Sequence, residues 1–329
     1  MEIKRKHDRL FKIETNKKVI NTPFFFPAIS SVKTNFEIGE CLKLIKKIGY
    51  PGFLVSSYDI YNAGEKEKNK LLGIISESTE GETLTLLDSG NYEAFWSNDK
   101  EWRFQNLESV LDKISVDFCF SFDIFWNERK NVKQHVKETV TSIAKTAGAQ
   151  KSGTTIPLLH SDSKSFPEIV RRVVEGINPE VIGVPERELG SSIFERATTV
   201  KRIRDELDKT NRQIPLHLLG TGNPISILIF TLCGADIYDA IEWCKTVVDP
   251  ETCHLFHFAQ KELIDCNCSA CKVKDVAYHT QTMAHNLIFY KKFTEKIRAS
   301  IEKNEIDQVL DACLGSRNTE KVKKIAGLK

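Results

Sequence analysis

Short apolar runs alternate with longer amphipathic segments along the chain, and this alternation limits the possible folds more than any other feature of the sequence. An apolar run followed by a stretch of helical periodicity is the repeating unit of a parallel sheet covered by helices. Eight such units predict a TIM (β/α)8 barrel. The expected strands are 24–28, 52–56, 83–87, 117–122, 155–160, 180–184, 215–219 and 235–238.

The segments between these runs show the periodicity of helices with one buried face. They cover residues 37–48, 107–114, 132–149, 166–176, 193–210 and 224–233. An open doubly wound sheet would show the same alternation, but its usual Gly-x-Gly-x-x-Gly turn does not follow the first expected strand. We therefore favour the barrel and assign it, as the catalytic domain, to residues 1–250.

A group of cysteines near the C-terminal end predicts a metal site. Cys266, Cys268 and Cys271 lie close together, and His285 follows on an expected helix. Three thiolates and an imidazole complete a tetrahedral set for structural Zn²⁺, which would hold the fold together without taking part in chemistry. The alternatives are His279 as the fourth ligand, or three free thiols in a reduced chain. We expect residues 251–329 to form a zinc-binding subdomain with C-terminal helices.

Composition is that of an ordinary globular protein, with 41% hydrophobic and 28% charged residues and a formal net charge of +2. No apolar stretch approaches the roughly 18 residues of a membrane span, so we expect no membrane association and a cytoplasmic location. The nine cysteines show no even framework of spacings, which favours reduced thiols. A nucleic-acid partner would need local positive charge, and residues 261–329 carry 13 Lys or Arg against 9 Asp or Glu.

Three aspartates follow or end different expected strands. Asp88 opens an Asp-Ser-Gly turn, Asp123 follows Phe-Cys-Phe-Ser-Phe, and Asp239 closes Ala-Asp-Ile-Tyr-Asp. Each alone is explained by the preference of aspartate for turns and helix N-termini. Because barrel strands bring their carboxyl ends to one rim, the three could meet. Paired carboxylates there suit displacement at a sugar anomeric carbon, in which one attacks and another moves a proton.

A series of short strings, in order along nearly the whole chain, resembles the tRNA-guanine transglycosylases. The strings are Thr22–Pro27, Leu54–Tyr58, Leu87–Gly90, Ser121–Asp123, Leu218–Gly222, Gly234–Asp239, the Cys266–Cys271 motif and His285–Tyr290. This family is a zinc-containing TIM barrel that exchanges guanine in tRNA for a 7-deazaguanine base without breaking the phosphodiester chain. The resemblance implies a pentosyltransferase whose partners are a nucleic acid and a free base of the preQ0, preQ1 or queuine type. It also suggests a homodimer.

The resemblance implies roles for individual residues. Asp239 matches the nucleophile that attacks ribose C1′, and Asp88 matches the general acid/base. Asp123 matches the carboxylate that binds the guanine-like edge, and Tyr92 matches an aromatic ring against the base plane. The remaining substrate-binding positions implied by the resemblance are Ser89, His160, Gly183, Leu219 and Gly220.

The chain also departs from the family pattern. Asn91 replaces a glycine and Glu93 a glutamine in the Asp88 turn, and His160 stands where a base-reading glutamine is usual. Residues 243–250 replace a Pro-Thr-Arg segment that lies near the nucleic-acid backbone. These changes leave open the same exchange on DNA guanine. No archaeal-type RNA-binding domain follows Lys329, so we expect the chain to act without that anchor.

Two further alternatives remain. The chain could be a non-catalytic partner subunit of a heteromeric transglycosylase, although the presence of all three aspartates argues against this. A barrel glycoside hydrolase that uses Asp88 and Asp239 would account for the carboxylates but not for the cysteine motif.

Overall fold

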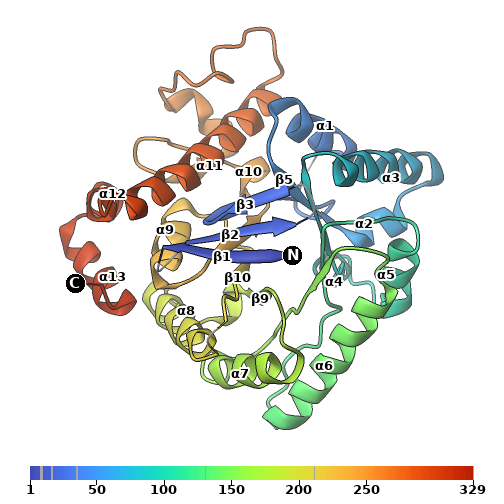
Figure 1. Ribbon diagram of the computed structural model, residues 1–329. Helices are drawn as coiled ribbons and strands as arrows, with labels where there is room; N and C mark the ends of the chain where they lie inside the picture. Colours follow the sequence, from blue (N-terminus) through green and yellow to red (C-terminus); the bar gives the residue numbers. More distant parts are fainter. Residues whose placement is uncertain (8–9, 16–17, 35, 130, 211, 329) are drawn as a thin grey trace.

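The computed structural model describes residues 1–328 apart from 8–9, 16–17, 35, 130 and 211, and its centre is a parallel β-barrel (Figure 1). Eight strands pair in parallel, and a bridge between Leu158 and Gly183 joins the two ends of the sheet. The predicted TIM barrel is therefore confirmed. The strands are β4 (Phe24–Ile29), β5 (Gly52–Ser56), β6 (Leu84–Asp88), β7 (Phe118–Phe120), β8 (Thr154–Ile156), β9 (Ile182–Pro185), β10 (Leu216–Leu219) and β11 (Ile237–Ala240).

Helices surround the barrel and turn their apolar faces toward it. In α7, the buried positions Phe166, Ile169, Val170 and Val173 repeat at the spacing of one helical face. The surrounding helices are α1 (Ile38–Ile48), α2 (Ser57–Asn62), α3 (Glu65–Glu80), α4 (Asn91–Trp96), α5 (Phe104–Leu111), α6 (Val132–Ala149), α7 (Phe166–Ile177), the 3-10 helix η1 (Glu186–Glu188), α8 (Ile193–Asp208), α9 (Pro224–Cys233), α10 (Glu242–Lys245) and α11 (Tyr278–Glu302).

The expected strands and the observed ones agree in order and differ mainly at their ends. The strand expected at 155–160 stops at Ile156, because Pro157 follows it and has no N–H for the ladder. Pairing continues beyond the proline through the amide of Leu159, which donates to the carbonyl oxygen of Gly183 over 2.9 Å. The segment after β8 thus reaches the barrel mouth in a path that brings His160 to the site.

An antiparallel sheet that the sequence did not predict covers the N-terminal end of the barrel. It consists of β1 (Glu2–His7), β2 (Leu10–Thr15) and β3 (Lys18–Asn21), and Figure 1 shows it lying across the ring. Its inner residues Phe11, Ile13 and Ile20 pack in one cluster with residues at the starts of the barrel strands. The Lys18 ammonium forms a buried ion pair with Asp117, 2.6 Å apart, just before β7. This sheet covers the barrel floor.

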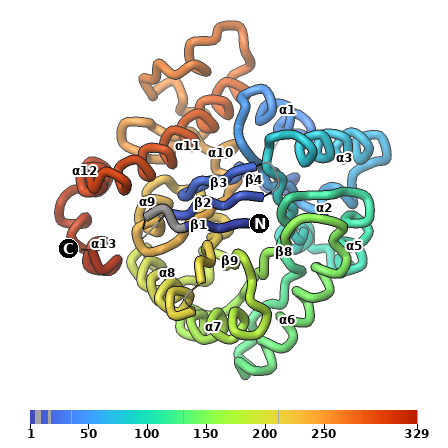
Figure 2. Tube along the Cα trace, viewed as in Figure 1, coloured from blue at the N-terminus to red at the C-terminus, as the bar shows by residue number. Residues whose placement is uncertain are grey.

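The C-terminal part of the chain packs along the outside of the barrel. A hairpin of β12 (Thr246–Val248) and β13 (Leu255–His257) leads through η2 (Phe258–Leu263) to α11, which contacts α1 and β4. Helices α12 (Ile306–Leu314) and α13 (Ser316–Ala326) lie against α9 and α8 (Figure 2). The domain boundary expected after residue 250 stays a prediction. Within the described ranges, no helix has the length and apolar character needed to cross a membrane.

Candidate active site

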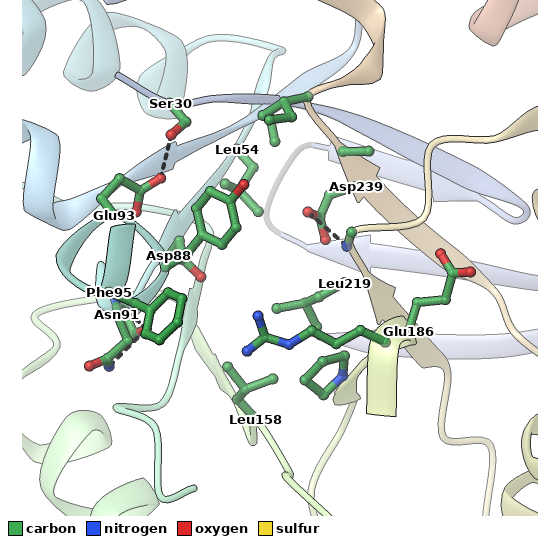
Figure 3. Close-up of a pocket in the computed structure, with 18 of the residues that line it drawn as sticks. Ser30, Leu54, Asp88, Asn91, Glu93, Phe95, Leu158, Glu186, Leu219 and Asp239 are labelled. Carbon is green, nitrogen blue, oxygen red and sulfur yellow. Dashed lines mark hydrogen bonds between the residues drawn. The ribbon is translucent and has the colours of Figure 1, made fainter. Parts of the chain in front are cut away.

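A cavity of about 740 Å³ opens at the carboxyl ends of the barrel strands. Asp88, Asp123 and Asp239 all line it, so three aspartates from distant parts of the chain meet in one place. Figure 3 shows Asp88 and Asp239 on opposite sides of the cavity. The volume is in the range of sites that bind small molecules.

Most of the other residues predicted for the site also line this cavity. They are Ser89, Tyr92, His160, Leu219 and Gly220. Gly183 is not among the described residues that line it. A Cβ atom at Gly183 would lie 2.8 Å from the Phe120 ring and 3.1 Å from the Leu219 side chain, so this glycine permits close packing inside the barrel.

Asp239 is held by a side chain of the neighbouring strand β10 and by the backbone amide that follows this strand. The Nε2 atom of His217 donates to its Oδ1 over 2.7 Å, and the amide of Gly220 lies 3.5 Å from its Oδ2. The His217 ring is fully buried and stacks on Phe26, with its centroid 6.1 Å from that of the phenylalanine. Among the described residues, its Nδ1 atom has no hydrogen-bond partner. Among the described residues, Asp239 is therefore the only hydrogen-bond partner of the His217 ring.

Sequence reasoning missed His217, although a signal was available. His217 lies two residues before Leu219 in the same strand, and alternate residues of a strand face the same side. His217 also pairs in register with Ile237, two residues before Asp239. A polar residue at an inward position of a barrel strand, next to a proposed nucleophile, is the pattern that would have identified it.

Asp88 lies at the end of β6 in a tight turn that encloses its side chain. Its Oδ2 accepts from the amide of Gly90 over 3.0 Å. Gly90 has φ +86°, and a Cβ atom there would lie 2.7 Å from the Trp102 ring, so a side chain would be strained and crowded. Burial raises the pKa of Asp88 well above its usual range, and the nearby charges of Glu93, Asp123 and Asp239 raise it further. The protonated form of Asp88 is therefore favoured, relative to that of an exposed aspartate.

Glu93 forms a second buried acid behind Asp88. It is only 3% exposed, and its carboxylate accepts from the hydroxyls of Ser30 over 2.7 Å and Ser56 over 2.6 Å. Burial is the main cause that raises the pKa of Glu93 to about 7, and the charge of Asp59 adds to it. Sequence reasoning identified Glu93 only as a departure from the family pattern. The structure places it among the residues that line the cavity.

Asp123 is surrounded by donors from the protein itself. His160 Nε2 lies 2.8 Å from its Oδ1, while Ser89 Oγ and Asn91 Nδ2 both donate to its Oδ2. Burial favours the neutral acid, but these hydrogen bonds and the charge of His160 outweigh it and lower the pKa of Asp123. An ionised carboxylate accepts about four hydrogen bonds, so one position remains for a ligand.

His160 joins Asp123 to Glu188 of η1. Its Nδ1 atom lies 2.8 Å from the Glu188 carboxylate, a partner that sequence reasoning did not identify. Burial would lower the pKa of His160, yet hydrogen bonds to the two carboxylates raise it to about 9. The ring is therefore a cation at neutral pH with both nitrogens donating, and it compensates the negative charge of Asp123.

The predicted metal ligands also meet in space. The ligand atoms of Cys266, Cys268, Cys271 and His285 all lie within 4.8 Å of one another. His285 Nδ1 is 3.4 Å from Cys271 Sγ and 3.7 Å from Cys268 Sγ. Ligands in a tetrahedral zinc site at the usual bond lengths are separated by about 3.6 Å, so these distances suit a structural metal.

The tautomer of His285 is also suited to a metal. Its Nε2 atom lies 2.8 Å from the carbonyl oxygen of Val248, which can only accept, so Nε2 carries the proton and Nδ1 faces the thiols with a lone pair. His279, the alternative ligand, instead stacks on Phe36 with ring centroids 5.5 Å apart. The structure therefore selects His285.

Comparison with known proteins agrees with this geometry. The profile of a family described as queuine tRNA-ribosyltransferase matches residues 5–319. The chain belongs to this family.

Curated relatives in the queuine tRNA-ribosyltransferase family are distant in sequence. The tRNA-guanine(15) transglycosylase of Nanoarchaeum equitans (strain Kin4-M) is 22% identical over 306 residues, which cover 90% of this chain and 72% of the relative. The enzymes of that name from Thermococcus onnurineus (strain NA1) and Sulfolobus acidocaldarius (strain ATCC 33909 / DSM 639 / JCM 8929 / NBRC 15157 / NCIMB 11770) are each 21% identical. The matches cover 92% and 91% of this chain but 54% and 62% of those relatives.

Replacing Glu93 by glutamine is expected to change how stability depends on pH. Between the unfolded pKa of 4.5 and the folded pKa of about 7, the folded chain keeps a proton that the unfolded chain releases. The free energy of unfolding therefore falls as pH rises through this window, by roughly 3 kcal/mol in total. Glu93→Gln should flatten this part of the profile, as measured by denaturant unfolding from pH 4.5 to 8. The exposed control Glu82→Gln should leave this part of the profile unchanged. A Glu93→Gln profile identical to that of the unmodified protein would contradict the assignment.

Removing one thiol of the cysteine cluster is expected to remove the metal. Cys271→Ser should lose bound metal and unfold at a lower temperature, because a structural site contributes its binding free energy to folding. Elemental analysis by mass spectrometry, together with thermal unfolding, provides the measurement. Cys313→Ser, at a partly exposed cysteine outside the cluster, is the matched control. Full metal retention by Cys271→Ser would show that the cluster is not the site.

Proposed function

We propose that this protein exchanges guanine in a nucleic acid for a 7-deazaguanine base, with Asp239 as nucleophile and Asp88 as general acid and base. The observation that carries the proposal is the meeting of these two residues across one cavity, where burial raises the pKa of Asp88. The names of the relatives, which are tRNA-guanine(15) transglycosylases, support the reaction type and favour tRNA as the polymer.

In the first step, a carboxylate oxygen of Asp239 attacks C1′ of the target nucleotide and the bond from C1′ to the guanine nitrogen breaks. The electron pair of that bond goes to the purine, and Asp88 supplies the proton that makes it a neutral leaving group. The hydrogen bond from His217 fixes the rotamer of Asp239, which keeps its attacking oxygen in one place.

In the second step, the incoming base attacks C1′ and releases the Asp239 carboxylate. Asp88, now ionised, takes the proton that the attacking nitrogen loses, so it returns to its starting state. Two displacements at the same carbon give net retention of configuration. Water must be kept from the covalent intermediate, and the side chains of Tyr92, Leu219 and Leu158 supply apolar cover around the cavity.

Asp123 and His160 are proposed to hold the base. The Asp123 carboxylate is kept ionised and can accept from an N–H of the guanine edge, while Tyr92 provides a ring surface beside it. We further propose that Zn²⁺ is the metal of the cysteine cluster, since three thiolates and one imidazole form a closed tetrahedral set that leaves no position for catalysis. A homodimer and a cytoplasmic location remain part of the proposal.

Incorporation of labelled base is the direct test. Purified protein incubated with labelled guanine, and separately with a labelled 7-deazaguanine, should transfer label into tRNA. A parallel reaction with single-stranded and duplex DNA tests the alternative polymer. Asp239→Asn should form no covalent complex with either polymer, because an amide is a poor nucleophile, while the surface control Asp205→Asn should form it normally. Incorporation into neither polymer would refute the proposal, and release of free sugar would favour the glycoside hydrolase alternative.

Replacing His217 is expected to slow the first displacement. His217→Phe keeps an aromatic ring between Phe26 and Phe120 but removes the hydrogen bond to Asp239. A bond to a charged acceptor is worth about 1.5–3 kcal/mol, so covalent-complex formation should slow by roughly 10- to 100-fold. Single-turnover trapping measures this rate. His217→Gln, which retains a donor, should recover part of it, and an unchanged rate in the phenylalanine variant would remove His217 from the mechanism.

A further inference from the structure

Three exposed aromatic side chains line the cavity or contact a residue that lines it. Phe95 and Trp96 of α4 are 69% and 47% exposed, and Phe125 after β7 is 50% exposed. Phe95 and Phe125 line the cavity, and the Phe95 and Trp96 rings lie 5.3 Å apart. Figure 3 shows Phe95 beside Asn91 of the catalytic turn. We refer to these three residues as the aromatic rim. Exposed aromatic surface costs solvation free energy, and a group of such residues indicates a binding surface.

Positive charge accompanies the aromatic rim. Lys33, Arg187 and Lys245 also line the cavity, and each is exposed. The Lys33 ammonium lies 3.2 Å from the centroid of the Trp96 ring. Within the described part of the chain, neither Lys33 nor Lys245 has an ion-pair partner, so their charges are free to meet an external anion.

The charged side chains that line the cavity therefore differ in sign between its buried part and its exposed mouth. Among the carboxylates that line the cavity, Glu93 is 3% and Asp239 6% exposed, whereas Glu186 and Glu242 are partly exposed. The charged lining residues that are exposed are the cations Lys33, Arg187 and Lys245. Aromatic rings with interspersed cations form the usual surface for unpaired nucleic acid, because rings stack on bases and cations contact phosphates.

We propose that the aromatic rim stacks on the unpaired nucleobases that flank the target nucleotide, while Lys33, Arg187 and Lys245 contact the adjacent phosphates. This inference rests on the proposed function for the presence of a nucleic acid, and it adds the form of that substrate. Bases in a duplex are stacked on one another and offer no free face, so the rim selects a loop or another single-stranded segment. The target nucleotide enters the cavity and its neighbours remain on the rim.

Equilibrium binding of RNA tests whether the aromatic rim contacts the nucleic acid, and it does not require catalytic turnover. The probe is a fluorescent RNA hairpin with an unpaired guanine in its loop, and anisotropy reports the dissociation constant for the full chain. Stacking is worth about 1–3 kcal/mol per base, so Phe95→Ala and Trp96→Ala should each weaken binding roughly 5- to 150-fold. Phe95→Tyr should bind as the unmodified protein does. Phe256→Ala, at an aromatic residue 39% exposed that does not line the cavity, is the matched control.

A thermodynamic cycle that combines protein substitutions with abasic sites in the RNA tests the contact between the aromatic rim and the flanking bases. Hairpins in which the bases beside the guanine are replaced by abasic sites should bind the unmodified protein more weakly by a similar factor. For a variant in which Phe95, Trp96 and Phe125 are all replaced by alanine, the abasic replacement should have little further effect, because the stacking partners have already been removed. Additive losses would show that the rim does not touch these bases, and equal binding of duplex and hairpin would overturn the inference.

The outcomes also separate this inference from the proposed function. If no base is incorporated but the hairpin binds with the expected cycle, the rim is supported and the catalytic proposal fails. If base is incorporated and the alanine variants bind and react normally, the catalytic proposal holds and the rim has another role. Burial of the rim in a homodimer would also overturn the inference, and it would appear as a monomeric state of Trp96→Ala in sedimentation measurements.

Discussion

Parallel pairing of the eight barrel strands brings every carboxyl end to the same rim, and the site depends on this constraint. This end of the barrel brings Asp88, Asp123 and Asp239 into one cavity, where they cannot all carry full charge without compensation. The structure resolves the conflict in two ways. A cationic His160 lowers the pKa of Asp123, whereas Asp88 has no such partner and its pKa is raised. The pKa values of two chemically identical side chains are thereby shifted in opposite directions, which suits the different roles proposed for them.

The metal cluster and the cavity are mechanically connected through α11. Asn286, next to the predicted metal ligand His285, donates to the carbonyl oxygens of Trp243 and Thr246, each over 2.7 Å. These carbonyls belong to the segment that follows Asp239 at the end of β11. One turn further along α11, Tyr290 donates to the carbonyl oxygen of Gly222, over 2.6 Å, in the segment after β10. A metal that orders the start of this helix would thus also order the loops beside the proposed nucleophile.

The sequence predicted the barrel and much of the site because both depend on local patterns. Strand and helix periodicities are visible within short windows, and Asp88 and Asp239 stand at strand ends that periodicity locates. The antiparallel sheet was not predicted, because its strands are short and rich in lysine and glutamate, which are uncommon in strands. The pairing of His160 with Glu188 was missed for a different reason. It joins residues on separate loops, and no periodicity reports which loops touch.

The antiparallel sheet across the opposite end of the barrel also limits how ligands can move. Phe11, Ile13 and Ile20 pack at that end of the barrel, and the described cavity opens at the carboxyl ends of the strands. In the proposed reaction, the departing purine and the arriving one would both use this opening, and the bound nucleic acid would lie across it. We therefore expect the two bases to exchange in sequence. The old base leaves first, and the proposed covalent intermediate persists until the new base binds.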